Sequence, residues 1–176
     1  MGATHNGHVL EMRNISKSFP GVKALDSVNF SLKSGEVHVL IGENGAGKST
    51  LIKILSGAYT ADNGEIYING SKVEINNPRT AIGLGVAVIY QELNLNPFTP
   101  IYENVFLGRE FTHRLGLLNT KKAIRETKRL IEQCGLDVSP KTAVKSLGVG
   151  QQQLVEIAKA ISMNAQVLVF DEPTSA

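Results

Sequence analysis

The sequence is poor in cysteine, lacks tryptophan and contains no long apolar run. Its one cysteine, Cys134, cannot form an internal disulfide, and no cluster of cysteine and histidine predicts a zinc site. No stretch approaches the roughly 20 apolar residues that a membrane-spanning helix needs. These absences fit a globular protein of a reducing compartment.

An excess of charge of one sign is also missing. The chain has 18 Lys and Arg against 16 Asp and Glu, a formal net charge of +2. Because nothing in this balance favours a polyanion, we expect no nucleic-acid partner. The charged run at residues 121–132 is interpreted as the solvated face of a helix.

One glycine-rich motif, G-x-x-x-x-G-K-S/T, is present between residues 42 and 50. Glycine lets backbone N–H groups approach a polyphosphate because no Cβ stands in the way. Lys48 is expected to reach the β- and γ-phosphates, and the Ser49 hydroxyl to bind Mg²⁺. The predicted nucleotide-binding residues are Gly42, Glu43, Asn44, Gly45, Ala46, Gly47, Lys48, Ser49 and Thr50.

The first half of the chain is predicted to be rich in strands. The apolar run Glu36–Ile41 predicts a buried strand before the motif, and Ser49–Ser56 predicts a helix after it. A short helix is expected to begin near Pro78. The other predicted strands are Val9–Met12, Val28–Leu32, Glu65–Ile68, Lys72–Ile75 and Val86–Tyr90.

The second half is predicted to be helical, from about residue 92 to residue 160. Thr120 is the expected N-cap of a helix that runs to Cys134, and a second helix is expected from Gln151 to Met163. The predicted core-facing residues are Ile124, Thr127, Ile131 and Cys134 in the first helix, and Leu154, Ile157, Ala158 and Ile161 in the second.

A last apolar run, Val167–Phe170, ends in two acids. Such a run predicts a strand buried in a parallel sheet, at whose carboxyl end ligands of α/β proteins bind. Asp171 is expected to hold magnesium through water, and Glu172 to polarise the water that attacks the γ-phosphate.

The motifs and their order along the chain resemble the ATP-binding subunits of ABC transporters, and the resemblance covers nearly the whole length. Residues 42–50 match the Walker A motif of that family, and Val167–Glu172 match Walker B with its catalytic glutamate. Gln91 matches the glutamine that links magnesium and the attacking water to the transmembrane partner. Phe19 lies where the family places an aromatic ring that stacks on adenine.

The segment 147–151 lies at the position of the family's signature loop, Leu-Ser-Gly-Gly-Gln. The resemblance implies that Gly148, Gly150 and Gln151 contact nucleotide held mainly by the opposite subunit. Gly148 departs from the pattern, which has a serine at this position. Glycine lacks the serine hydroxyl but keeps the backbone N–H donors. We therefore expect weaker closure of the composite site.

The resemblance implies an α/β fold of the P-loop NTPase class, with a mixed β-sheet core, an antiparallel β subdomain and an inserted α-helical subdomain. Residues 1–91 would form the ATP-binding core with the β subdomain, 92–160 the helical subdomain, and 161–176 the return to the core. The region 91–108 would face the membrane partner, with Leu93, Leu95, Phe98 and Phe106 as candidate docking residues.

The stretches 91–95 and 103–109 and the final helix are most similar to the ribose, galactose and xylose importers. The implied function is ATP hydrolysis, with ATP and Mg²⁺, that powers import of a sugar. The implied partners are a second ATP-binding domain, transmembrane permease subunits and, indirectly, a periplasmic sugar-binding protein. The implied location is peripheral, at the cytoplasmic face of the plasma membrane.

The family's domain continues past Ala176 to a further core strand and a histidine that contacts the γ-phosphate. We therefore expect a C-terminally truncated first domain with weak or no hydrolysis by itself. Two alternatives stay open: an ABC-type ATPase without a transport role, and a nucleotide-binding module without turnover.

Overall fold

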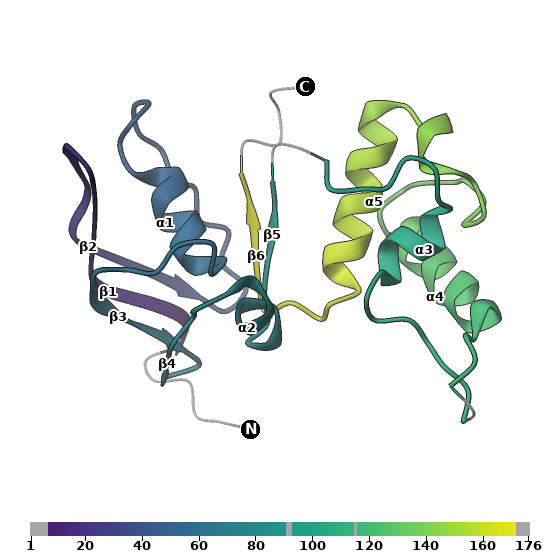
Figure 1. Ribbon diagram of the computed structural model, residues 1–176, viewed down its shortest axis with the longest axis horizontal. Coiled ribbons are helices and arrows are strands. Elements are labelled where there is room, and N and C mark those ends of the chain that lie inside the picture. Colours follow the sequence, from purple (N-terminus) through teal and green to yellow (C-terminus); the bar gives the residue numbers. More distant parts are fainter. Residues whose placement is uncertain (1–6, 91–92, 115, 172–176) are drawn as a thin grey trace. The chain divides into compact units, whose positions relative to one another are not determined.

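The computed structural model describes residues 7–90, 93–114 and 116–171, which divide into two compact units (Figure 1). The first unit contains residues 7–88 and 166–169, and the second contains the described residues from 89 to 165 with 170 and 171. The assignment of these units to an ATP-binding core and a helical subdomain stays a prediction.

A four-stranded antiparallel sheet forms most of the first unit, with the strand order β2-β1-β3-β4. Its two long strands pair Phe19 with Val22, and the turn between them places Gly21 at φ 82°, a conformation that glycine adopts without strain. The strands are β1 (His8–Phe19), β2 (Val22–Lys33), β3 (Asn63–Ile68) and β4 (Ser71–Val73). The antiparallel β-sheet of the prediction is thus present.

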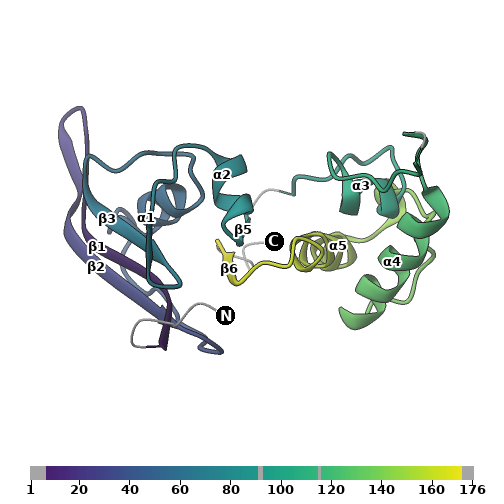
Figure 2. The same ribbon diagram turned by 90° about the horizontal axis from the view of Figure 1, so that it is seen from below.

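Two helices accompany this sheet. Helix α1 (Lys48–Leu55) lies beside it in both views and buries one apolar face in a common core with the strands (Figures 1 and 2). Helix α2 (Pro78–Gly83) begins after Asn77, whose side-chain oxygen accepts a hydrogen bond from the Thr80 N–H at 2.9 Å. Both helices were predicted: α1 differs from the expected Ser49–Ser56 by one residue at each end, and α2 begins at Pro78 as expected.

The predicted strand at Glu36–Ile41 is absent, and this prediction is wrong. The segment has no strand pairing, and its apolar side chains point into solvent, with Val37 92% and Ile41 90% exposed. A strand requires a neighbour that satisfies its backbone hydrogen bonds. No strand among the described residues pairs with residues 36–41.

Strands β5 (Val86–Ile89) and β6 (Val167–Phe170) form a separate two-stranded sheet. Backbone bonds from Val167 to Gly85 and from Asp171 to Ile89 advance together along both segments, as they do in a parallel pair. β6 has the predicted bounds, but the prediction that it is buried is wrong beyond Val167. Leu168 is 37% and Phe170 42% exposed, because β6 has one neighbouring strand in the described part of the chain.

The second unit is helical. Its helices are α3 (Ile101–Phe106), α4 (Thr120–Gln133) and α5 (Val149–Ile161), and a 3₁₀ turn lies at Val144–Ser146. They enclose one apolar core, in which Ile101, Ile131 and Val155 are fully buried.

Several details of the helical prediction were wrong. The N-cap of α4 is Asn119, whose side chain accepts from the Lys122 N–H, because asparagine caps better than threonine. The predicted Thr127 and Ile131 are buried and Cys134 packs against the core, whereas Ile124 is only half-buried, and Ala123 and Leu130 belong to the core instead. Helix α5 begins two residues early, at Val149. It buries the predicted Ala158, and the predicted Leu154 packs against the core. Val155 and Ala160 are buried in place of Ile157 and Ile161, since the apolar residues of this helix span more than one face.

Candidate functional site

The glycine-rich loop leads directly into helix α1. Gly45 and Gly47 have φ values of 86° and 85°, in the left-handed region that favours glycine. The Ala46 N–H donates to the Glu43 carbonyl at 3.1 Å. The Lys48 ammonium donates to the carbonyl oxygens of Gly42 and Glu43 at 2.6 and 2.8 Å, so it closes the loop into a ring.

The N-terminus of α1 is suited to an anion. Gly47 is its N-cap and offers no side chain, and the first turn contains no acidic residue. The first backbone N–H groups of a helix have no partner within it, and the helix dipole adds partial positive charge at the same place. Lys48, Ser49 and Thr50 form this first turn, so a phosphate group fits the residues present.

Phe19 lies at the end of β1 in the same unit as the glycine-rich loop. Its ring is half-buried and meets the Tyr59 ring edge-on at 5.4 Å between centroids. The Lys17 ammonium lies 5.8 Å from the Phe19 centroid. Stacking of Phe19 on adenine stays a prediction.

The remaining predicted site residues belong to the second unit or lie outside the described residues. Asp171 follows β6, and its N–H donates to the Ile89 carbonyl at 2.9 Å. Gln91 and Glu172 lie outside the described part of the chain. No group of three or more His, Cys, Asp or Glu within residues 7–90, 93–114 and 116–171 is placed to hold a metal ion.

The segment 148–151 begins helix α5. Gly148 is the N-cap, with an extended backbone at φ −67° and ψ 159°, and its N–H donates to the Gln151 side-chain oxygen at 3.1 Å. A Cβ at residue 148 would meet nothing within 4 Å, so a serine fits here without strain. Gly150 and Gln151 lie in the first turn, where backbone donors face an anion most readily.

We expect Gly148→Ser to stabilise α5 and to raise the rate of ATP hydrolysis in the full-length protein. Serine is a better N-cap than glycine by a few tenths of a kcal/mol, and a hydroxyl bonded to a phosphate contributes roughly 1.5–3 kcal/mol. The measurement is a comparison of ATPase rates, with Gly148→Ala as the control that adds a Cβ without a hydroxyl. Equal rates in the serine and alanine variants would contradict the expectation.

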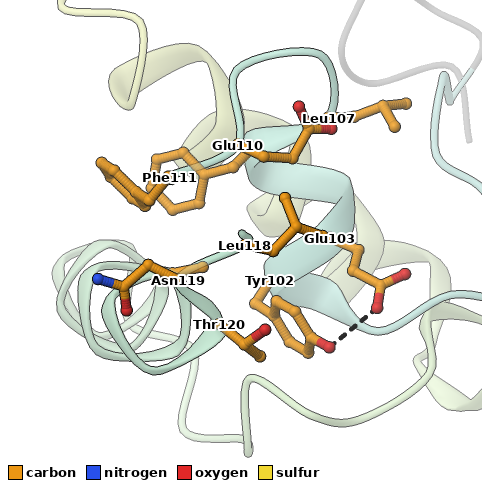
Figure 3. Close-up of a pocket in the computed structure, with 10 residues that line it drawn as sticks. Tyr102, Glu103, Leu107, Glu110, Phe111, Leu118, Asn119 and Thr120 are labelled. Atoms are coloured by element: carbon orange, nitrogen blue, oxygen red, sulfur yellow. Dashed lines mark hydrogen bonds between the residues drawn. The ribbon is translucent and has the colours of Figure 1, made fainter. Parts of the chain in front are cut away.

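A cavity of about 280 Å³ lies within the helical unit (Figure 3). Phe106, Phe111 and Leu118 form much of its apolar wall, and the Tyr102 hydroxyl donates to Glu103 at 2.9 Å at its edge. None of the predicted nucleotide-binding residues lines it. Its volume is at the lower limit of small-molecule sites, which span about 300–1,000 Å³.

Sequence reasoning missed two polar features of the helical unit. Asn104, 1% exposed, accepts and donates hydrogen bonds that hold residues 96–100, and Glu156 is buried on α5. Burial raises the pKa of Glu156, while Lys159 and the Asn94 N–H partly oppose that rise. The only signals in the sequence were the residue types themselves, an asparagine at 104 and a glutamate at 156, each among apolar residues.

A glycine-rich loop closed by a lysine and opening a helix defines a nucleotide-binding protein of the P-loop class. The sequence model of the ABC transporter family matches residues 25–175. This chain therefore belongs to the ABC transporter family.

Known relatives and structures agree with this placement. A ribose import ATP-binding protein of Streptomyces avermitilis is 52% identical over 95% of this chain and 32% of its own length. A xylose import ATP-binding protein of Thermoanaerobacter pseudethanolicus is 52% identical over 96% of this chain and 34% of its own length. The chain thus spans about a third of the curated relatives that it matches.

Among solved structures, the ADP conformation of an ATP-binding cassette of an ABC transporter superposes with a TM-score of 0.82. That cassette is 27% identical, and the match covers 96% of this chain and 70% of the cassette. The fold is therefore that of an ABC ATPase cassette of the P-loop NTPase class, as predicted. In the described part of the chain no helix is both long and apolar enough to cross a bilayer.

Proposed function

We propose that this chain is an ATP-binding and hydrolysing part of a protein that powers sugar import through an ABC transporter. The observation that carries this proposal is the closed loop of Gly42 to Lys48 at the N-terminus of α1. Two relatives are named as ribose and xylose import ATP-binding proteins, and these names support a sugar as the transported substrate.

The residues present fit Mg-ATP, which supplies the phosphoryl group whose transfer to water releases free energy. Gly45, Gly47 and Lys48 would hold the phosphates through backbone N–H groups and the ammonium. Ser49, Asp171 and Gln91 would hold magnesium, and Glu172 would orient the attacking water as general base. Gly148, Gly150 and Gln151 would serve the nucleotide of the opposite subunit, since a loop at a helix N-terminus binds phosphate oxygens.

The partners in this proposal are a second ATP-binding domain, transmembrane permease subunits and, indirectly, a periplasmic sugar-binding protein. Phe98 is 77% exposed and supports docking by the region 91–108, whereas Phe106 is buried and Leu95 packs against the helical core. A peripheral position at the cytoplasmic face of the plasma membrane follows from such a complex.

Calorimetric titration with Mg-ATP tests the proposal directly. We expect micromolar-range binding by the wild-type chain, about −8 kcal/mol. Lys48→Ala should abolish measurable binding, because the ammonium and its interactions with the phosphates are lost. Lys72→Ala is the matched control, since Lys72 is exposed on β4 and pairs with Glu65 at 2.6 Å. Equal affinities in the two variants would contradict a nucleotide site at Lys48.

A further inference from the structure

Three consecutive residues that precede Phe19 in β1 are bound to one aspartate. The Asp62 N–H donates to the Ser16 carbonyl at 2.9 Å. The Asp62 carboxylate accepts a hydrogen bond from the Lys17 ammonium and another from the Ser18 N–H, each at 2.7 Å. The pairing of β1 with β3 ends at Ser16, so these bonds extend the hold on β1 to the residue before Phe19.

The role of Asp62 is to fix this backbone rather than to form an ion pair. The side chains of Lys17 and Asp62 are 18% and 41% exposed, and an ion pair this open to solvent contributes little stability by itself. The Lys17 ammonium and the Ser18 N–H hold the pKa of the Asp62 carboxyl below its usual range, so the carboxylate is charged at neutral pH. A charged acceptor makes a strong bond to a backbone N–H, and that bond fixes the end of β1.

The ring of Phe19 is supported by the ring of Tyr59. The two ring centroids lie 5.4 Å apart and the ring planes meet at 65°. This edge-to-face arrangement is one that aromatic pairs favour. Both residues are half-buried, so the contact holds the Phe19 ring while part of its surface stays open to a ligand.

Tyr59 is in turn tied to helix α1, which begins at the glycine-rich loop. Its N–H donates to the Lys53 carbonyl at 3.0 Å, and the Lys53 ammonium lies 5.3 Å from the centroid of its ring. Strand β2 makes a second connection: a Cβ at Gly47 would lie 2.7 Å from Cδ2 of Leu25, and Leu25 pairs with Lys17 of β1. The supported ring and the glycine-rich loop therefore belong to one packed scaffold.

We propose that Tyr59 and Asp62 are positioning residues for the nucleotide base, which hold the Phe19 ring in place to contact it. This role rests on the proposed function. A ring that is fixed before binding needs little ordering when the base arrives, and this raises the affinity. Because neither residue serves the phosphates, loss of either lowers the affinity for ATP and leaves the affinity for a bare triphosphate unchanged.

Calorimetric titrations of the full chain with Mg-ATP and with magnesium tripolyphosphate separate the base from the phosphates. Tyr59→Leu removes the supporting ring, whereas Tyr59→Phe keeps it. Asp62→Ala removes the carboxylate, and Asp26→Ala is its matched control, because Asp26 forms an exposed ion pair with Lys23 at 2.6 Å in the same unit. Urea unfolding of each variant verifies that it is folded.

We expect Tyr59→Leu and Asp62→Ala to weaken the binding of Mg-ATP roughly three- to tenfold, because an aromatic contact or a charged hydrogen bond is lost. Tyr59→Phe and Asp26→Ala should stay within about twofold of wild type, as should the affinity of every variant for tripolyphosphate. In Phe19→Ala the contact with the base is lost. Adding Tyr59→Leu to that variant should then weaken binding no further, since the two residues act through one contact.

An equal loss of affinity for ATP and tripolyphosphate would overturn the proposal, because it would indicate a defect of the glycine-rich loop. Wild-type affinity for ATP in Tyr59→Leu or in Asp62→Ala would contradict it, as would additive losses when Phe19→Ala and Tyr59→Leu are combined. If the wild-type chain bound tripolyphosphate as tightly as ATP, the positioning role would fail and the phosphate site would stand. If it bound neither, the proposed function would fail, and this role with it.

Discussion

Replacing Gly47 with alanine is expected to destroy nucleotide binding and to destabilise the first unit. Gly47 has φ 85°, and a Cβ at this position would lie 2.6 Å from the carbonyl oxygen of Ala24 and 2.7 Å from Cδ2 of Leu25. The Ala24 oxygen belongs to the backbone of β2, which cannot move without disturbing the sheet. Left-handed strain and overpacking together should lower the free energy of unfolding by about 2–5 kcal/mol.

Gly45→Ala is the matched control for this prediction. Gly45 has nearly the same φ, 86°, but a Cβ there would meet nothing within 4 Å. We expect its free energy of unfolding to fall by only about 1–2 kcal/mol, the cost of the left-handed conformation for alanine. Urea unfolding of both variants and calorimetry of Gly47→Ala with Mg-ATP check the prediction. Equal stability of the two variants would show that β2 yields to the extra methyl group.

The second large effect is expected at Asn104 in the helical unit. Its side chain accepts from the Asn96 N–H and donates to the Asn96 and Pro100 carbonyls and the Thr99 hydroxyl, at distances from 2.7 to 3.1 Å. Alanine would remove these bonds at a site that is 1% exposed and would leave the Asn96 N–H without its acceptor, whereas the Pro100 carbonyl would keep the Glu103 and Asn104 N–H groups. Because a buried unsatisfied group costs about 1–3 kcal/mol, we expect Asn104→Ala to lower the free energy of unfolding by about 3 kcal/mol or more.

Asn119→Ala gives the comparison, since it removes an asparagine from the same unit. Asn119 caps α4 through one bond, to the Lys122 N–H at 3.0 Å. Loss of an N-cap costs about 1 kcal/mol. Urea unfolding followed by far-ultraviolet circular dichroism measures both variants. A loss at Asn104 no larger than that at Asn119 would contradict the network that the structure shows around Asn104.

Elements with local signals were predicted well from the sequence. The periodic residues after Lys48 and the run Val167–Phe170 predicted a helix and a strand close to their observed bounds, and Pro78 marked the start of α2. The local pattern of Glu36–Ile41 is equally apolar, but the segment forms no strand. A strand depends on a partner from elsewhere in the chain, and periodicity within a segment carries no information about that partner.

The same distinction applies to the candidate site. The motif at residues 42–50 was recognisable because its chemistry resides in consecutive residues. The hydrogen bond from the Lys159 ammonium to the Asn94 carbonyl was not, because the two residues are 65 positions apart and the acceptor is a backbone carbonyl, which no residue type reveals. Residue types indicate side-chain chemistry, whereas long-range contacts to the backbone follow only from the fold.

The ring that Lys48 forms with its own loop makes nucleotide binding an exchange reaction. The ammonium donates to two carbonyl oxygens, of Gly42 and Glu43. Binding replaces these partners with phosphate oxygens, so the heat released on titration reports the difference between two sets of hydrogen bonds. The affinity then depends largely on the release of water and counterions and on a loop that needs little ordering. A small binding enthalpy is therefore compatible with tight binding.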